Sequence, residues 1–170
     1  MYFSNDTLKN GLNPYLTTKR GKGREIGMDV ALLVLEPGEE FRFSEKELES
    51  ALLLFRGAAL WRANDAEWRV SRKNEFEEEA SCLHVCAGTK VFVRAERHSE
   101  IYIQKVRNEA RFAPKCYLPQ EIQIQRAGET QLQGTMRRNI KTVFDYENAP
   151  YSNMVLGEVV NFPGKWSSYP

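Results

Sequence analysis

The sequence predicts an all-β protein, a sandwich or barrel, and three observations support this fold class. Short apolar or alternating runs begin near Met28 and recur about every ten residues, the spacing of strands in sandwiches and barrels. Turn sequences such as Pro37-Gly38 and Asn64-Asp65 separate these runs. The 170 residues contain no repeat of short period and no low-complexity tract, so they suffice for one domain, or one domain and part of another.

The expected strands follow in chain order. The first is rich in Val and Leu, and the second alternates apolar and polar residues. A hairpin turn at 64–67 joins two strands that carry Trp61 and Trp68. The complete expected set is 29–35, 40–43, 51–55, 58–62, 68–70, 81–85, 90–94, 101–106, 121–127, 137–144 and 154–162.

Residues 44–55 allow a second interpretation. Ser44-Glu45-Lys46-Glu47 resembles a helix capping box, and Leu48, Leu52 and Phe55 keep helical spacing. We favour a strand over 51–55, because Gly57 and the next apolar run leave no room for a packed helix.

Composition along the chain divides it into four parts. Residues 1–25 are polar and are expected to be irregular, ending in the loop Lys19-Arg20-Gly21-Lys22-Gly23-Arg24. That loop matches no phosphate-binding spacing, so a solvated loop is favoured. Residues 26–107 hold the main run of strands, 108–120 form a connector with Pro114 and Pro119, and 121–170 supply further strands.

Charge and composition exclude several classes of function. Hydrophobic residues make up 42% and charged residues 28%, as in a folded globular protein. A net charge of +1 argues against nucleic-acid binding, and no apolar run approaches the ~20 residues of a membrane span. Residues 1–13 resemble no signal peptide, and three cysteines without disulfide-type spacing indicate a reducing compartment, so we expect a cytoplasmic protein.

The glycine frame has the spacing of the two cupin signatures. Pro37-Gly38, Gly57 and Cys86-Ala87-Gly88 stand where a cupin barrel has its conserved turns. The first cupin signature places His-x-His and a Glu between its two glycines. The second signature places a third His shortly after its glycine. Residues two apart on a strand share a face, so such a set converges on a metal inside the barrel.

The residues that bind the metal in the cupin signatures are missing from this sequence. The two histidine positions after Gly38 fall at Ser44 and Lys46, and the third falls at Val91. The carboxylate position before Gly57 falls at Ser50, with Glu49 one step out of phase and on the opposite strand face. An ammonium such as Lys46 would repel a cation, so we expect a metal-free cupin barrel over 26–107 and no metal ligands in this chain.

The last segment resembles one family specifically. Residues 155–159 (Val-Leu-Gly-Glu-Val) and 163–170 (Pro-Gly-Lys-Trp-Ser-Ser-Tyr-Pro) resemble the middle of 5-deoxy-glucuronate isomerases, the bicupins of myo-inositol catabolism. In that family a Pro-Gly-x-Trp-Ser-Ser-Tyr-Pro string immediately precedes the His-x-His of the second cupin. Residues 138–140 (Arg-Asn-Ile) resemble the same inter-cupin region.

The resemblance implies the N-terminal portion of an aldose–ketose isomerase whose divalent metal belongs to the second cupin. The substrate would be a sugar acid, with Trp166, Ser167 and Tyr169 as weak substrate-binding candidates and no catalytic residue in this chain. Residues 121–170 would be inter-cupin strands and the start of a second cupin. Because the chain stops after a strand and a turn, we expect a truncated protein that is inactive alone.

Cys82-x-His84-x-Cys86 is a rival site. With Cys116 it could form a Cys3His zinc site, but same-face strand residues lie nearly 7 Å apart and zinc–sulfur bonds are about 2.3 Å, so buried thiols are favoured. A nucleophilic Cys–His pair fails on the same geometry. We expect His98 to be solvated in a polar hairpin turn at 97–100.

Three further features have plain explanations. Trp61 and Trp68 could stack a sugar, but cross-strand packing is favoured. Arg137 and Arg138 point to opposite faces of a strand, so at most one could bind a carboxylate. The acidic run 75–79 is expected to be a solvated loop.

Two other functions remain open from the sequence. One is a free-standing, metal-free cupin module that binds a sugar acid or a partner protein, and the other is a Cys/His zinc domain. Exposed sheet edges would also allow a homodimer.

Overall fold

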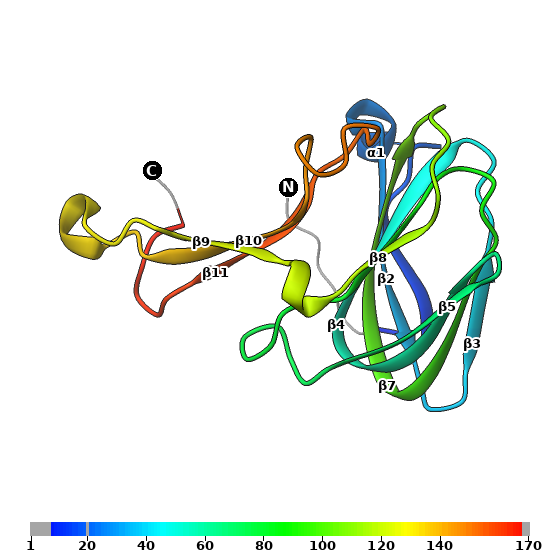
Figure 1. The fold of residues 1–170 in the computed structure, drawn as a ribbon, viewed down its shortest axis with the longest axis horizontal. Coiled ribbons are helices and arrows are strands. Elements are labelled where there is room, and N and C mark those ends of the chain that lie inside the picture. The colour runs from blue at the N-terminus through cyan, green and yellow to red at the C-terminus, as the bar shows by residue number, and fades with distance from the viewer. Residues whose placement is uncertain (1–7, 20, 168–170) are drawn as a thin grey trace.

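The computed structural model describes residues 8–19 and 21–167, which form two antiparallel sheets (Figure 1). The larger sheet has the order β1-β2-β7-β4-β6-β8, with β3 also paired to β7 and β5 to β4. Its strands are β1 (Gly11–Leu16), β2 (Met28–Leu35), β3 (Glu40–Phe43), β4 (Leu48–Ala63), β5 (Ala66–Arg72), β6 (Cys82–Val85), β7 (Val91–Arg107) and β8 (Lys115–Tyr117).

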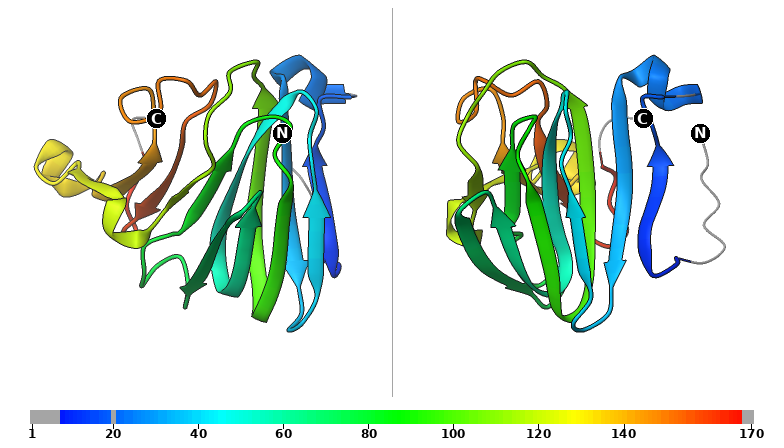
Figure 2. Two further views of the ribbon diagram at one scale, coloured as in Figure 1. Left: turned by 45° about the vertical axis from the view of Figure 1, so that its right-hand side comes forward. Right: turned by 90° about the vertical axis from the view of Figure 1, so that its right-hand side faces the viewer.

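Two long strands give this sheet its curl. β4 has 16 residues and β7 has 17, and they pair along almost their whole lengths. The register shifts three times between Leu54 and Ala59, and such bulges bend and twist a strand pair. One edge of β7 therefore pairs with β2 in its second half and with β3 in its first half (Figure 2).

The predicted all-β, cupin-type fold is confirmed, with one qualification. Among the described residues no strand pairing closes the large sheet into a hydrogen-bonded ring. Side chains close it instead, because the inward-facing residues of opposite strands pack into one apolar cluster. That cluster contains Ala31, Leu33, Leu35, Leu52, Leu54, Ala59, Trp61, Ala63, Val70, Leu83, Val85, Val91, Val93, Ala95, Ile101, Ile103 and Cys116.

A second, separate sheet follows. It consists of β9 (Gln123–Ala127), β10 (Arg138–Phe144) and β11 (Leu156–Asn161) in the order β11-β10-β9, and it extends to one side of the barrel (Figure 1). The strands predicted after residue 121 thus form a sheet of their own. A second apolar cluster, which includes Leu53, Tyr117 and Phe144, joins this sheet to the outer face of the barrel.

Short helices accompany the strands. Residues Gly21–Ile26 form α1, and two 3-10 turns, η1 (Pro119–Glu121) and η2 (Gln131–Gly134), flank β9. The longest α-helix of the described residues, with six residues, is too short to cross a bilayer, and no described helix meets that requirement.

Several local predictions need correction. The N-terminal part is not wholly irregular, because β1 pairs with β2 and α1 replaces the expected loop at 19–24. His98 lies within the continuous strand β7, not in a turn, and forms an ion pair with Glu36 at 2.9 Å that raises the pKa of His98. The connector contains β8, which pairs with β6. The strand interpretation of 51–55 is confirmed by β4.

The bend of β4 predicts a strict need for glycine at position 57. Gly57 has φ +116°, and a Cβ there would collide with Ser99 Oγ and the His98 carbonyl oxygen. We expect Gly57→Ala to lower the free energy of unfolding by about 3 kcal/mol or more, measured by urea denaturation. Gly38→Ala is the matched control, since Gly38 has φ +87° with open space around it, and should cost about 1 kcal/mol. Equal losses in the two variants would contradict this account of the bend.

Candidate functional site

The positions that hold metal ligands in a cupin carry unsuitable groups here. Ser50 shares the inward face of β4 with Leu52 and Leu54, and its buried hydroxyl has no hydrogen-bond partner among the described residues. Val91 is 3% exposed in the apolar cluster, while Ser44 and Lys46 precede β4 and are exposed. One hydroxyl and one valine offer no imidazole or carboxylate to a cation, so these residues do not fit a metal.

The end of the barrel lined by Glu45 and Lys105, here called the barrel mouth, contains a buried ammonium group. This group belongs to Lys105 and not to Lys46, the residue considered from the sequence. Lys105 is 9% exposed and occupies an inward position of β7, two residues beyond Ile103. Its Nζ lies 2.6 Å from Glu45 Oε1 and 4.4 Å from the ring centroid of Phe43. Lys46 is exposed, so the positive charge at the mouth belongs to Lys105. The alternation Ile101-x-Ile103-x-Lys105 was the sequence signal for it.

Glu49 faces the opposite way, as predicted, into the junction between the two sheets. It is fully buried, and its carboxylate accepts hydrogen bonds from Asn108 Nδ2 at 2.7 Å, the Asn153 amide at 2.9 Å and Ser152 Oγ at 3.1 Å. Burial would raise the pKa of Glu49, but the nearby His84 ring and the hydrogen bonds from Asn108 and Asn153 outweigh it, so the pKa is lowered.

His84 lies beside this carboxylate in an aromatic enclosure. Its Nε2 is 3.6 Å from Glu49 Oε2, and its ring stacks on Phe144 with a centroid distance of 4.2 Å and an interplanar angle of 3°. Phe112 packs at 4.7 Å from the same ring. Neither ring nitrogen has a hydrogen-bond partner within the described chain, so no Cys–His nucleophile pair forms there.

The Cys/His cluster considered for zinc is divided between two faces of the barrel wall. Cys82 belongs to the cluster outside the barrel, whereas Cys116 pairs with Leu83 and belongs to the cluster inside it. Burial raises the pKa of the Cys82 thiol and raises that of Cys116 to about 12. Residues 8–19 and 21–167 contain no group of three side chains able to hold a metal ion.

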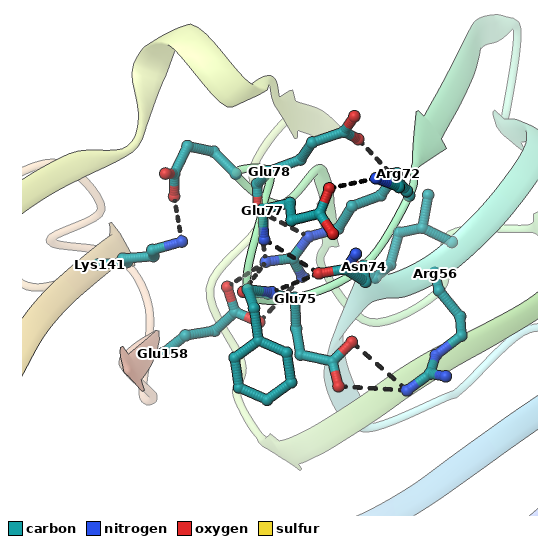
Figure 3. Close-up of polar contacts among 12 residues, drawn as sticks. Arg56, Arg72, Asn74, Glu75, Glu77, Glu78, Lys141 and Glu158 are labelled. Atoms are coloured by element: carbon teal, nitrogen blue, oxygen red, sulfur yellow. Dashed lines mark hydrogen bonds and ion pairs between the residues drawn. The ribbon is translucent and has the colours of Figure 1, made fainter. Parts of the chain in front are cut away.

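Arg72 joins the two sheets electrostatically (Figure 3). Its side chain is fully buried, and it donates to Glu158 of β11 twice, from Nη1 at 2.9 Å and from Nη2 at 2.7 Å. The remaining donors bind main-chain carbonyls, Leu54 at 2.9 Å and Glu78 at 2.9 and 3.1 Å. All five N–H groups are therefore used, as a buried guanidinium requires.

The acidic run 75–79 is part of this junction and not only a solvated loop. Glu79 forms an ion pair at 2.9 Å with Lys141 of β10, which is 4% exposed. Glu75 pairs with Arg56 at 3.1 Å, and Glu78 supplies the carbonyl that binds Arg72 (Figure 3). The sequence showed the acidic run but not its pairing with Lys141, which lies far away in the chain.

A cleft of about 550 Å³ opens beside this junction, between the outer face of β4 and β7 and the free edge of β11. The rings of Phe55 and Tyr102 stack along its wall with centroids 5.8 Å apart. Gln104 and two carboxylates, Glu75 and Glu158, add hydrogen-bonding groups to the lining. Sequence reasoning missed this cleft, since its walls come from four separate segments.

The residues predicted from the family resemblance lie elsewhere. Trp166 is 63% exposed, and its amide donates to the Thr135 carbonyl at 2.9 Å, which attaches the segment after β11 to the turn before β10. Ser167 is exposed as well, while Tyr169 lies outside the described residues. The structure does not bring Trp166 and Ser167 to either the barrel mouth or the cleft lining.

The remaining aromatic and basic candidates have structural roles. Trp61 and Trp68 are cross-strand partners in β4 and β5, with Trp61 fully buried, as the packing explanation predicted. Arg137 lies 4.7 Å from the ring centroid of Phe162, and Arg138 donates to the Met136 carbonyl.

Together, the curled antiparallel sheet, its two long bent strands and its packed interior define a cupin-type β protein. Residues 5–170 match the model of the KduI/IolB family, and the chain belongs to that isomerase family. No relative matches it among curated protein sequences.

One solved structure in particular agrees with this fold. An IolB-like protein from Salmonella typhimurium LT2 superposes with a TM-score of 0.74 at 20% identity, covering 85% of this chain and 54% of its own. This chain thus spans about half the length of that protein. The plu4264 protein of Photorhabdus luminescens gives a TM-score of 0.48 at 13% identity, with 64% and 88% covered. The Cnp3 cupin domain of Schizosaccharomyces pombe gives 0.46 at 13% identity, with 61% and 70% covered.

The buried ion pair between the sheets should dominate their docking. We expect Arg72→Met to lower the free energy of unfolding by about 3–5 kcal/mol, because it leaves Glu158 and two carbonyls without their donor. Arg56→Met, which removes a half-exposed ion pair with Glu75, should cost less than about 1 kcal/mol. Urea denaturation of both variants tests this, and similar small losses would show that the junction does not depend on Arg72.

The lowered pKa of Glu49 predicts a pH-dependent stability. Its ionised form is favoured in the folded state, so the stabilisation is complete above the ordinary glutamate pKa of about 4.3 and is lost as pH falls through the lower folded value. Glu49→Gln should therefore cost about 2 kcal/mol at pH 7 and flatten the decline of stability between about pH 5 and pH 3. Unfolding curves at several pH values measure this, with Glu109→Gln, 90% exposed, as the control. An unchanged slope in Glu49→Gln would refute the role of this carboxylate.

Proposed function

We propose that this chain is the non-catalytic, N-terminal half of a two-barrel aldose–ketose isomerase that acts on 5-deoxy-glucuronate. Membership of the KduI/IolB family supports the reaction class, and the 54% coverage of the Salmonella protein supports a half-length role. We include a cytoplasmic location and a place in myo-inositol breakdown in this proposal, and the free state of Cys82, Cys86 and Cys116 is consistent with that location.

The observation that carries the proposal is the composition of the barrel interior. An aldose–ketose isomerisation moves a proton between adjacent carbons and needs a base together with a group that polarises the carbonyl. At the cupin ligand positions this barrel has Ser50 and Val91 facing an apolar cluster, and Ser44 and Lys46 exposed outside it. Ser50 and Val91 therefore offer neither a base nor a group that could polarise a carbonyl.

The role that remains for this barrel is support. Its outer wall holds the three-stranded sheet through Arg72–Glu158 and Lys141–Glu79, and this sheet leads directly into Trp166 and Ser167. A rigid base of this kind would fix the position of the segment that, in the family, precedes the catalytic histidines. Trp166, Ser167 and Tyr169 are then the residues of this chain proposed to lie nearest the substrate.

An activity assay tests the proposal. We expect the 170-residue chain, dialysed against Mn²⁺ or Zn²⁺, to retain well under one equivalent of metal and to give no conversion of 5-deoxy-glucuronate to the ketose. Elemental analysis and product chromatography provide the two readouts. Turnover together with stoichiometric metal would overturn the assignment of a non-catalytic half.

A second candidate function is a metal-free binding module, and the 550 Å³ cleft favours it. Stacked rings beside carboxylate and amide groups are the elements of a site for polyhydroxyl compounds, and Phe55, Tyr102 and Gln104 supply them there. Saturable calorimetric binding of glucuronate that is lost in Tyr102→Ala, without turnover, would favour this alternative.

A further inference from the structure

A cationic pocket of about 460 Å³ lies on the barrel where β3 and β4 flank the start of β7. Its lining includes three cationic side chains, Arg42, Arg62 and Lys90, and no carboxylate. The cleft beside Arg72, in contrast, is lined by two carboxylates and no cationic side chain. Those two carboxylates are ion-paired with Arg56 and Arg72, so the concentration of positive charge is particular to the first pocket.

The strand register places the two arginines in this pocket. Arg42 of β3 and Arg62 of β4 are both cross-strand partners of Phe92 in β7, one on each side. Their guanidinium carbons lie 4.8 and 5.5 Å from the centroid of the Phe92 ring. One half-buried ring thus holds two positive charges together by cation–π contacts, and an anion between them would relieve their repulsion.

Lys90 completes the pocket from a neighbouring turn. The Asn64 amide donates to the Lys90 carbonyl at 3.1 Å, and the Lys90 amide donates to Asn64 Oδ1 at 3.3 Å. This reciprocal pair joins the β4–β5 hairpin to the turn before β7, so the backbone at Lys90 is fixed relative to Arg62. A fixed backbone at Lys90 lowers the entropic cost of bringing its side chain to an anion beside Arg62.

The charges of the pocket are available to a ligand. Within residues 8–19 and 21–167, no carboxylate lies at ion-pair distance from Lys90. Arg42 pairs with Glu40 at 2.9 Å and Arg62 pairs with Glu67, but both arginine side chains are more than half exposed. Exposed ion pairs of this type contribute little free energy, so an anion can exchange with them at small cost.

We propose that the cationic pocket formed by Arg42, Arg62 and Lys90 binds a small organic molecule with two or more oxyanion groups, either carboxylates or phosphates. Two guanidinium forks suit bidentate contacts with such groups, and Lys90 adds a point charge. The hydroxyl of Ser44 and the amide of Asn64 also line the pocket and can bind a polar ligand body. The site is separate from the region proposed for the isomerase substrate and does not depend on that proposal.

Calorimetric titration of the 170-residue chain at low ionic strength tests the site, with citrate as the carboxylate probe and inorganic pyrophosphate as the phosphate probe. We expect saturable 1:1 binding of at least one probe, weakened about tenfold or more in Arg62→Gln and in Lys90→Met. Glu67→Gln should tighten binding, because it removes the carboxylate that competes for Arg62. Arg126→Gln, an exposed arginine of β9, is the matched control and should bind as the parent does.

The two probes distinguish a carboxylate site from a phosphate site. Binding of citrate alone identifies a carboxylate site, and binding of pyrophosphate alone identifies a phosphate site. Absence of saturable binding for both probes overturns the proposal, as does an affinity that Arg62→Gln and Lys90→Met leave unchanged. Unfolding midpoints of the variants, expected to match the parent because the substituted side chains lie at the surface, exclude misfolding as the cause of lost binding.

Discussion

The structure depends on one constraint, which is that the first half of strand β4, residues 49–54, is buried on both faces. Leu52 and Leu54 face the barrel interior, while Ala51 and Leu53 face the second sheet. A polar group on a strand with two buried faces is shielded from water, and a charged one is very costly without hydrogen-bond donors. The inward Ser50 is tolerated because a hydroxyl is small and neutral, but the outward Glu49 needs a complete set of donors.

The polar residues between the sheets follow from that constraint. Glu49 accepts hydrogen bonds from Asn108, Ser152 and Asn153. Arg72 donates hydrogen bonds to Glu158 and to two main-chain carbonyls. Glu49 lies more than 50 residues from each of its three donors, and Arg72 lies as far from Glu158, so these contacts specify one relative placement of barrel and sheet. The apolar cluster between them supplies the area buried, and the charged pairs define the orientation.

The fold was largely predictable because strand periodicity and glycine turns are local signals. The expected pairs around 64–67 and the strand over 51–55 were both recovered, since alternation and turn chemistry determined them. His98 was misplaced because Arg97-His98-Ser99-Glu100 is polar like a turn, although it continues β7 through the bend. β1 was missed because an edge strand with Asn13 and Pro14 lacks the apolar run that marks a central one.

The site was less predictable than the fold. The missing cupin ligands could be located by counting from glycines, but Lys105, Arg72 and the Arg42–Phe92–Arg62 row depend on cross-strand register. Register is decided by bulges such as those around Gly57, whose positions are not encoded by any periodic pattern. The side-chain pairs across the sheet could therefore be identified only from the structure.

Lys105 gives the barrel mouth a property that a metal-binding cupin lacks. Its ammonium is covalently part of the chain and is neutralised by Glu45 at 2.6 Å, so charge balance at the mouth is complete as soon as the strands form. Folding of a metalloprotein is linked to the concentration of its ion. The Lys105–Glu45 pair, in contrast, needs no ion from solution to balance its charge.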